Sequence, residues 1–349
     1  MRKVNYEIDV VLATAIIVAL FCTAVTFFVT HYYIDKAKIT YDDALSRPGM
    51  LYTENAIASN TCKYEIKTLG GFHYIKPLMF VDRVCSDDRL ASIKQAIIAL
   101  VDSNKVAGNL SSAGVYLRDL SGNSWIGINE NEKFNPGSLL KVPKLITFLK
   151  MNECKPGILE EKVLFDRQIV PNQSSIYSAQ FIKVGHEYTI RQLLKQMIQY
   201  SDSNATELLN RQMDKALFVK LFADLGLSQP NVSSNMANFQ ISTRDYSIFM
   251  RALYNAAYLS IDDSEYATEL LSNTDFKGGL IKDLPKTLQV ANKIVDSGEN
   301  NSSELSESAI VYLNNKTYQI TVMTKGANYD RLPELLAQIS SKVYTTMLN

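Results

Sequence analysis

The chain has 349 residues, of which 46% are hydrophobic and 21% are charged, and its formal net charge at pH 7 is +0. A chain of this length buries a sizeable core, in one large domain or in two modest ones. The balanced charge provides neither a basic excess for nucleic acid nor an acidic tail. We therefore expect an ordinary globular protein that does not bind nucleic acid.

An uncharged apolar segment, VVLATAIIVALFCTAVTFFV, lies near the N-terminus at residues 10–29. As a helix that rises about 1.5 Å per residue, it matches the thickness of a bilayer core. It is longer than the apolar part of a signal peptide, and aromatic residues suited to a membrane interface follow it. Because Arg2 and Lys3 precede the span, we expect a cytoplasmic tail at 1–9, a single-pass cell-membrane anchor at 10–34 and an extracytoplasmic remainder.

The four cysteines are spread along the chain. Cys22 lies in the expected anchor, whereas Cys62 and Cys85 flank a short segment that would lie outside the cell. That environment makes a disulfide between Cys62 and Cys85 plausible, with Cys154 left over, and the alternative that the sequence leaves open is three free and buried thiols. Neither a C-x-x-C motif nor a His/Cys cluster is present, so we expect no metal and no cofactor.

Residues 35–86 have no strong periodicity, and we expect an extracytoplasmic stalk or a small subdomain there. The main domain is expected at 87–349. It begins with a predicted helix near 90–101, for which Asp87 or Asp88 is the expected cap. A hairpin follows, with strands at 113–119 and 124–129 joined by a Ser-Gly-Asn turn.

The middle of the chain has helical apolar spacing, and strands return near its C-terminal end. Helices are predicted at 139–150, 189–200, 204–214, 217–225 and 243–258, with Thr189 and Thr243 as N-caps. Strands are predicted at 287–295, 308–313 and 318–324, a tight turn at 314–316, a final helix at 330–347, and a mobile loop at 296–306.

This order of elements predicts an α+β fold. The simplest assembly is one antiparallel sheet built from both ends of the domain and covered by helices, with the helical insert as a second lobe. A cleft between the two lobes is the expected place for a functional site.

Ser138 and Lys141 lie where the hairpin ends and an apolar helix begins. Three residues apart on a helix, they share a face, with Cβ atoms about 5–6 Å apart. A serine hydroxyl is a weak nucleophile until a base removes its proton, and a lysine becomes that base when burial and nearby positive charge lower its pKa. The helix N-terminus also offers N–H groups to an oxyanion.

An S-x-x-K spacing occurs by chance about once in a chain of this length, but two further segments support it. Tyr200-Ser201-Asp202-Ser203-Asn204 interrupts the helical middle, and Ala291-Asn292-Lys293 lies on a returning strand. In this order and context, the three segments resemble the active-site motifs of the class A β-lactamase and penicillin-binding-protein superfamily.

The resemblance covers roughly residues 87–349. It is carried by NEKFNPGSLLKVPKLITFLK, YTIRQLLKQMIQYSDSNATELL, LPKTLQVANK and the paired strands AIVYL and YQITVMTKG. It implies a β-lactamase- or transpeptidase-like fold with Ser138 as the acylated nucleophile, Lys141 as its base and Ser201 as the proton shuttle to the leaving nitrogen. It also implies that Asp202 holds the loop, that Ser203 binds substrate, and that Lys293 attracts the substrate carboxylate and polarises Ser201.

Two motifs differ from the family pattern. The family's S-D-N reads S-D-S here, and Ser203 cannot offer both a carbonyl and an amide to a substrate. The family's K-T-G reads Lys293-Ile294-Val295. Ile294 has no hydroxyl for a carboxylate, and Val295 places a branched side chain where close approach is usual. The strand can still donate backbone hydrogen bonds to an extended substrate.

Class A β-lactamases carry a glutamate between the second and third motifs that activates the hydrolytic water, but residues 226–244 of this chain contain no acidic residue. Glu207, Glu265 and Glu269 lie on predicted helices and are expected to be solvated. We therefore expect a serine hydrolase that forms an acyl-enzyme with a β-lactam or a D-Ala-D-Ala-type peptidoglycan peptide and deacylates slowly. The alternative is a β-lactamase-fold protein that has lost its chemistry and binds wall peptides or a protein partner.

Overall fold

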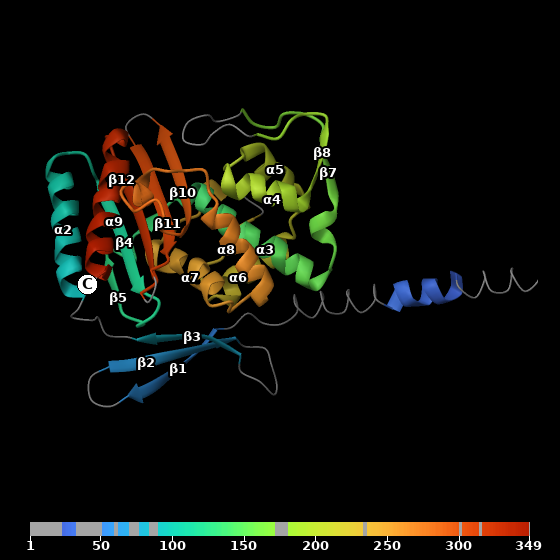
Figure 1. Ribbon diagram of the computed structural model, residues 1–349, viewed down its shortest axis with the longest axis horizontal. Coiled ribbons are helices and arrows are strands. Elements are labelled where there is room, and N and C mark those ends of the chain that lie inside the picture. Colours follow the sequence, from blue (N-terminus) through green and yellow to red (C-terminus); the bar gives the residue numbers. More distant parts are fainter. Residues whose placement is uncertain are drawn as a thin grey trace, which may run out of the picture.

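The computed structural model describes residues 23–32, 51–58, 62–69, 77–83, 90–171, 181–232, 236–299, 302–313 and 316–348. A five-stranded antiparallel sheet, ordered β10-β11-β12-β4-β5, forms the frame of its main body. β4 (Ser112–Asp119) and β5 (Trp125–Ile128) precede the helical lobe, whereas β10 (Val290–Glu299), β11 (Ser302–Val311) and β12 (Tyr318–Gly326) follow it. The prediction of one sheet built from both ends of the domain is confirmed (Figure 1).

Two helices cover one face of this sheet, α2 (Ala91–Val106) and α9 (Leu332–Leu348) (Figure 1). Because side chains alternate along a strand, Val115 and Leu117 of β4 point into the core beneath these helices. The same alternation turns Tyr116 and Arg118 toward the opposite face. α2 begins after Leu90, which provides no side-chain cap, and the caps expected at residues 87 and 88 lie outside the described residues.

A helical lobe packs on the other side of the sheet. Its helices are α3 (Lys141–Cys154), α4 (Ile190–Gln199), α5 (Ser203–Gln212), α6 (Lys215–Asp224), α7 (Thr243–Tyr254) and α8 (Ile261–Ser272). α3 is buried along most of its length, as a helix through the centre of a lobe must be. The Thr189 cap is confirmed, with a capping box to Gln192, but α7 is capped by Ser242 rather than by Thr243.

The mobile loop predicted at 296–306 is wrong. β10 and β11 stay paired through the whole stretch, from Val290 opposite Val311 to Glu299 opposite Ser302. The polar composition indicated a loop, but a ladder depends on backbone hydrogen bonds rather than on side-chain polarity. Leu305 and Ser306 are buried there, so tertiary packing outweighs the local sequence.

The N-terminal region forms a second, three-stranded antiparallel sheet of β1 (Leu51–Ala58), β2 (Cys62–Leu69) and β3 (Leu78–Arg83). The sequence periodicity did not predict these strands. The sheet lies beside the main body (Figure 1), and β3 inserts Met79 and Phe80 into the core of the helical lobe. The Arg251 guanidinium lies 4.3 Å from the centre of the Phe80 ring, which joins the two parts further.

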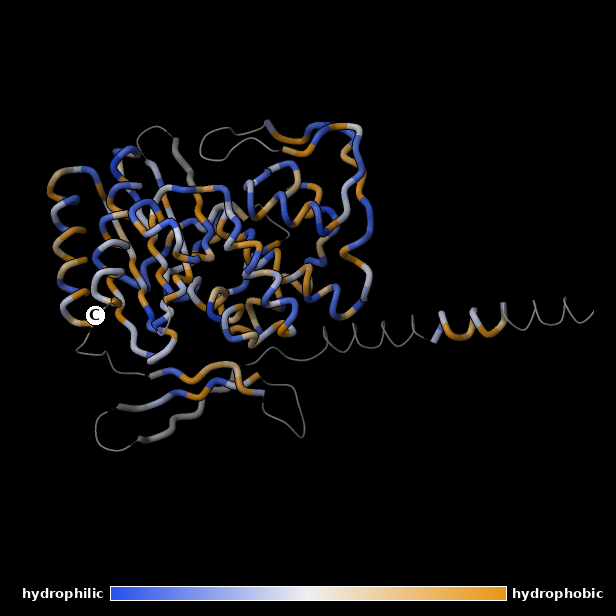
Figure 2. The backbone as a smooth tube through the Cα atoms, viewed as in Figure 1, coloured by the Kyte–Doolittle hydropathy of each residue, from blue (hydrophilic) through white to orange (hydrophobic). Residues whose placement is uncertain are grey.

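Only residues 23–32 of the expected membrane anchor are described, as a mainly hydrophobic helix with exposed side chains (Figure 2). Within the described residues, no helix combines the length and the hydropathy needed to cross a membrane. Cys85 lies outside the described residues, so its disulfide with Cys62 stays a prediction, and Cys154 is free and buried. The turn predicted at 314–316 also falls largely outside them.

The insertion of Phe80 can be tested by truncation. We expect Phe80→Ala to lower the free energy of unfolding by about 3–5 kcal/mol, because it removes a buried ring and leaves a cavity. Leu78→Ala on the same strand is the matched control, since the Leu78 side chain is 59% exposed whereas that of Phe80 is 3% exposed. Urea denaturation measures both, and equal losses in the two variants would show that β3 is not anchored through Phe80.

Candidate active site

Ser138 lies in a 3-10 turn, Gly137–Leu140, that runs directly into α3. The turn is held from both sides. The Asn135 side chain accepts a hydrogen bond from the Gly137 N–H at 2.9 Å, and the buried Tyr246 hydroxyl donates to the Leu139 carbonyl at 3.0 Å. Ser138 is half-buried, and its hydroxyl forms no hydrogen bond within the described residues, so it is available to a ligand.

Strand β10 lies against this turn at Gly137. A Cβ atom built there would lie 2.6 Å from Cγ2 of Val295, and the backbone φ of Gly137 is +45°. Only glycine satisfies both conditions without strain. The family pattern places a glycine on the strand, but here the strand carries Val295 and the facing turn supplies the glycine. Gly137 is therefore the residue that lets this turn pack against Val295.

Ile294 does not face the same side as Val295. Its side chain is buried in the core between the sheet and α9, whereas Val295 belongs to the core of the helical lobe. This alternation follows from strand geometry. The replacement of the family's threonine by Ile294 removes a hydroxyl, but the Ile294 side chain lies in the core and not on the side of Gly137.

Lys141 is the first residue of α3, one turn after Ser138, and it is 5% exposed. Its Nζ donates to the Ser201 hydroxyl and to the Ser201 carbonyl, both at 2.8 Å. These two bonds bring together the first and second motifs, which lie 60 residues apart in the sequence.

The second motif is a tight connection between α4 and α5. Ser201 has a φ of +54°, a conformation that costs a non-glycine residue about 1–3 kcal/mol and persists only where the surroundings impose it. Asp202 imposes it. Its fully buried carboxylate caps α5 by accepting from the Ala205 N–H at 2.9 Å and accepts from the Ile182 N–H at 2.8 Å.

Ser203 is the first residue of α5 and is half-buried. The next residue, Asn204, is buried and holds a neighbouring segment instead of facing a substrate. Its Oδ1 accepts from the N–H groups of Ile169 and Val170 at 2.9 and 3.0 Å, and its Nδ2 donates to the Val170 carbonyl at 3.0 Å. Sequence reasoning missed this residue, although an asparagine directly after S-D-S was a visible signal.

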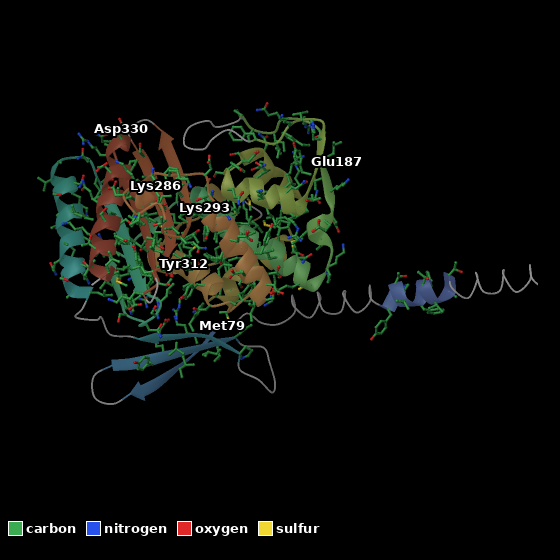
Figure 3. The ribbon with its side chains drawn as sticks, in the orientation of Figure 1. Met79, Glu187, Lys286, Lys293, Tyr312 and Asp330 are labelled. Atoms are coloured by element: carbon green, nitrogen blue, oxygen red, sulfur yellow. The ribbon has the colours of Figure 1, made fainter. Side chains whose placement is uncertain are left out.

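Lys293 is fully buried between the sheet and the helical lobe (Figure 3). Its Nζ donates to the Ile198 carbonyl at 3.0 Å, at the end of α4 and three residues before Ser201. Burial lowers the pKa of Lys293 well below its usual value, and the positive charge of Lys141 lowers it further. All three motifs thus meet in one place, with the two lysine amines close enough to repel each other.

A buried polar network fixes the start of β10 beside Lys293. The Glu307 carboxylate accepts from the Asn292 side chain and from the Leu280 N–H, each at 2.7 Å. The Thr274 hydroxyl donates to the side-chain amide oxygen of Asn292 at 2.6 Å. Burial raises the pKa of Glu307 to about 8, so this carboxyl is largely neutral at pH 7.

The Lys141 amine is poised to act as a base. Its pKa is lowered to about 7, mainly by burial and in addition by the positive charge of Lys144, with Asp202 opposing the shift. Near pH 7, about half of the Lys141 amines are therefore neutral and able to accept a proton. An amine hydrogen-bonded to Ser201 can exchange a proton with that hydroxyl, whereas the structure shows no hydrogen bond between Lys141 and Ser138 within the described residues.

Lys144 was not singled out from the sequence. It is buried one turn beyond Lys141, and burial lowers its own pKa, with Glu207 opposing. Its spacing of three residues from Lys141 was the available signal. The expectation that Glu207 is solvated is wrong, because that side chain is half-buried and interacts electrostatically with Lys144, whereas Glu265 and Glu269 are exposed on α8.

The fold and the site define a serine hydrolase of the penicillin-recognising type. The family model of the beta-lactamase enzyme family matches residues 92–347, and the chain belongs to this family. No curated protein sequence matches the chain.

Solved structures have the same fold. PBP-A is 24% identical, over 76% of this chain and 98% of that chain, with a TM-score of 0.65. A beta-lactamase from Chitinophaga pinensis is 17% identical, over 73% and 98% of the two chains, with a TM-score of 0.64. The TLA-3 extended-spectrum beta-lactamase is 16% identical, over 74% and 99%, with a TM-score of 0.66. These alignments use nearly all of each relative and leave about a quarter of this chain unmatched.

The contact between Gly137 and Val295 gives a direct test of the site's packing. We expect Gly137→Ala to lower the free energy of unfolding by about 1–3 kcal/mol more than Gly108→Ala, because overpacking adds to backbone strain only at Gly137. Gly108 also has a positive φ, +73°, but a Cβ there would meet nothing within 4 Å. Thermal denaturation measures both variants. The loss should shrink when Val295→Ala is added, and a loss that Val295→Ala leaves unchanged would contradict the contact.

Proposed function

We propose that this protein is a membrane-anchored, extracytoplasmic serine hydrolase. It forms an acyl-enzyme at Ser138 with β-lactams or with D-Ala-D-Ala-type wall peptides and releases the acyl group slowly. The single observation that carries the proposal is the buried Lys141 amine, which has a pKa near 7 and is hydrogen-bonded to Ser201 one helical turn from Ser138. Family membership supports hydrolase chemistry on β-lactams.

Acylation follows from this arrangement. The neutral Lys141 amine takes the proton of the Ser138 hydroxyl as the serine oxygen attacks the carbonyl carbon. Backbone N–H groups at the start of the helical turn stabilise the oxyanion. The carbon–nitrogen bond then breaks, and the proton passes from Lys141 through the Ser201 hydroxyl to the leaving nitrogen. The 2.8 Å bond between Lys141 and Ser201 supports this path.

Substrate binding rests on the same strand and loop. Asp202 keeps the loop in place, and Ser203 lines the binding site. The role of Lys293 toward a substrate carboxylate and Ser201 rests on the family resemblance alone, since its amine is fully buried and donates to the Ile198 carbonyl. β10 is an edge strand of the described sheet, so it supports backbone hydrogen bonding to an extended substrate. A solved structure of a PBP-A mutant is an acyl-enzyme complex with penicillin G, which supports β-lactams as ligands for this fold.

Slow deacylation is inferred from the segment between the second and third motifs. Residues 226–244 carry no acidic side chain to activate a hydrolytic water. The anchor rests on the uncharged segment at 10–29 and on the preceding Arg2 and Lys3. Together these features favour a peptidase-like or antibiotic-target role over rapid antibiotic hydrolysis.

We expect nitrocefin to give a burst of about one equivalent per enzyme, followed by slow steady turnover, because acylation outpaces deacylation. Ser138→Ala should abolish both the burst and covalent labelling by a fluorescent penicillin. Stopped-flow absorbance and gel fluorescence provide the measurements. Ser341→Ala, on the C-terminal helix, is the control that should keep both signals.

Two results would contradict the proposal. Rapid linear turnover without a burst would show that another group replaces the missing glutamate. Wild-type protein that stays unlabelled at high probe concentration would favour the alternative, a binding protein that has kept the fold and lost the chemistry.

The acylation rate should rise with pH through a midpoint near 7, because the neutral Lys141 amine is the reactive form. Lys144→Met removes a positive charge that disfavours protonated Lys141, so the pKa of Lys141 and the midpoint should rise. At pH 7 the rate should fall roughly two- to fivefold. Lys155→Met, at the exposed end of the same helix, should leave the pH profile unchanged. A Lys144→Met profile identical to that of wild type would show that Lys144 does not tune the base.

A further inference from the structure

The N-terminal sheet and the main body enclose a cavity of about 180 Å³ away from the three active-site motifs. One wall comes from β2 and β3, and the other comes from β4, β5 and α7. The family match begins at residue 92, so two of the strands that form this cavity lie outside the matched region. The cavity is therefore not part of the hydrolase site described above.

Asp82 links the two walls. Its carboxylate contacts Arg251 of α7, lies 3.1 Å from Nη2 of Arg118 on β4, and lies 3.3 Å from Nζ of Lys67 on β2. One carboxylate thus forms ion pairs with three cations. Glu65 is the second acidic side chain on the cavity wall, and Arg244 adds a fourth cation. The wall therefore carries four positive and two negative side chains.

The positive charge is buried. The side chains of Arg118 and Arg251 are 1% and 6% exposed. The buried Nε of Arg118 has no hydrogen-bond partner within the described residues, although the other guanidinium nitrogens are bonded. The single Asp82 carboxylate compensates only part of this buried positive charge, and burial together with the charge of Arg118 lowers the pKa of Arg251. An anion in the cavity would remove this penalty.

We propose that this cavity binds a phosphate group. A doubly charged oxyanion balances the surplus charge. Exposed Arg244 and half-buried Lys67 are the cations that reach it directly, whereas Arg118 and Arg251, already paired with Asp82, add positive potential behind them. The volume accommodates one phosphate with a few waters, since each water occupies about 30 Å³, and it excludes a whole nucleotide. Arg244 is exposed and stacks 5.2 Å from the Trp125 ring centre, so it lies on the solvent side of the site.

Binding would also fasten the N-terminal sheet to the main body, because the ligand lies between residues of both. This coupling predicts that the ligand raises the melting temperature of the whole chain. The test does not depend on the chemistry of Ser138, so its result is independent of whether the proposed function is correct.

The experiment titrates the full chain with inorganic phosphate at fixed ionic strength, with chloride as the comparison ion. Calorimetry should give a saturable Kd, and the melting temperature should rise by about 2 °C at tenfold excess over that Kd. Arg244→Gln should weaken binding at least tenfold, whereas Arg211→Gln, an exposed arginine on α5, should not. Arg118→Lys keeps the charge but cannot reproduce the bonds of the guanidinium to Asp82, Tyr116 and Asn123, so the charge moves away from the cavity wall and binding should also weaken.

Phenyl phosphate distinguishes the two sources of the group. Binding of phenyl phosphate assigns the site to phosphate esters, and binding of inorganic phosphate alone assigns it to the free ion. Either result supports the proposal. A phosphate effect that chloride reproduces, or one that persists unchanged in both Arg244→Gln and Arg118→Lys, would overturn it.

Discussion

The active site depends on keeping the Lys141 amine out of water without leaving it unbonded. α3 carries the lysine into the interior of the helical lobe, and Ser201 supplies two oxygen acceptors for its nitrogen. Those acceptors are in place because Asp202 caps α5 and also accepts a hydrogen bond from the Ile182 N–H of a neighbouring segment. The same burial that makes the amine reactive therefore requires an accurately folded loop.

This arrangement lowers stability as well as providing reactivity. In the unfolded chain Lys141 has an ordinary pKa of 10.5, whereas in the folded chain the value is about 7. Between these pH values the unfolded state binds more protons, so this residue's contribution to stability improves as the pH rises through that range. A positively charged neighbour such as Lys144 adds to the cost at neutral pH. Such a cost is typical of a site selected for chemistry.

Part of this site can be predicted from the sequence, because Ser138 and Lys141 are close together in the chain. The three-residue separation of Ser138 and Lys141 fixes their shared helical face, and the order of the motifs predicts a sheet built from both ends. Thr189 shows the same principle, since a cap and its Gln192 partner lie within one turn. Features set by a few neighbouring residues are the ones that sequence reasoning predicts well.

The remaining features depend on contacts between distant segments. The fit of Val295 against Gly137 joins positions far apart in the sequence, and neither residue alone predicts it. Residues 296–306 of β10 and β11 were predicted as a loop because they are polar, whereas their stability comes from the ladder and from buried Leu305. Strands β1 to β3 were not predicted because their sequences have only weak periodicity. Their position depends instead on a distant contact, the insertion of Phe80 into the core of the helical lobe.

The most direct test measures the protonation of Lys141 itself. Protein with isotope-labelled lysine side chains can be titrated by NMR, and the Lys141 signal can be assigned from its loss in Lys141→Met. We predict that this signal titrates with a midpoint near 7, well separated from those of exposed lysines. A midpoint near 10.5 would mean that the amine is charged at neutral pH and cannot be the base for Ser138.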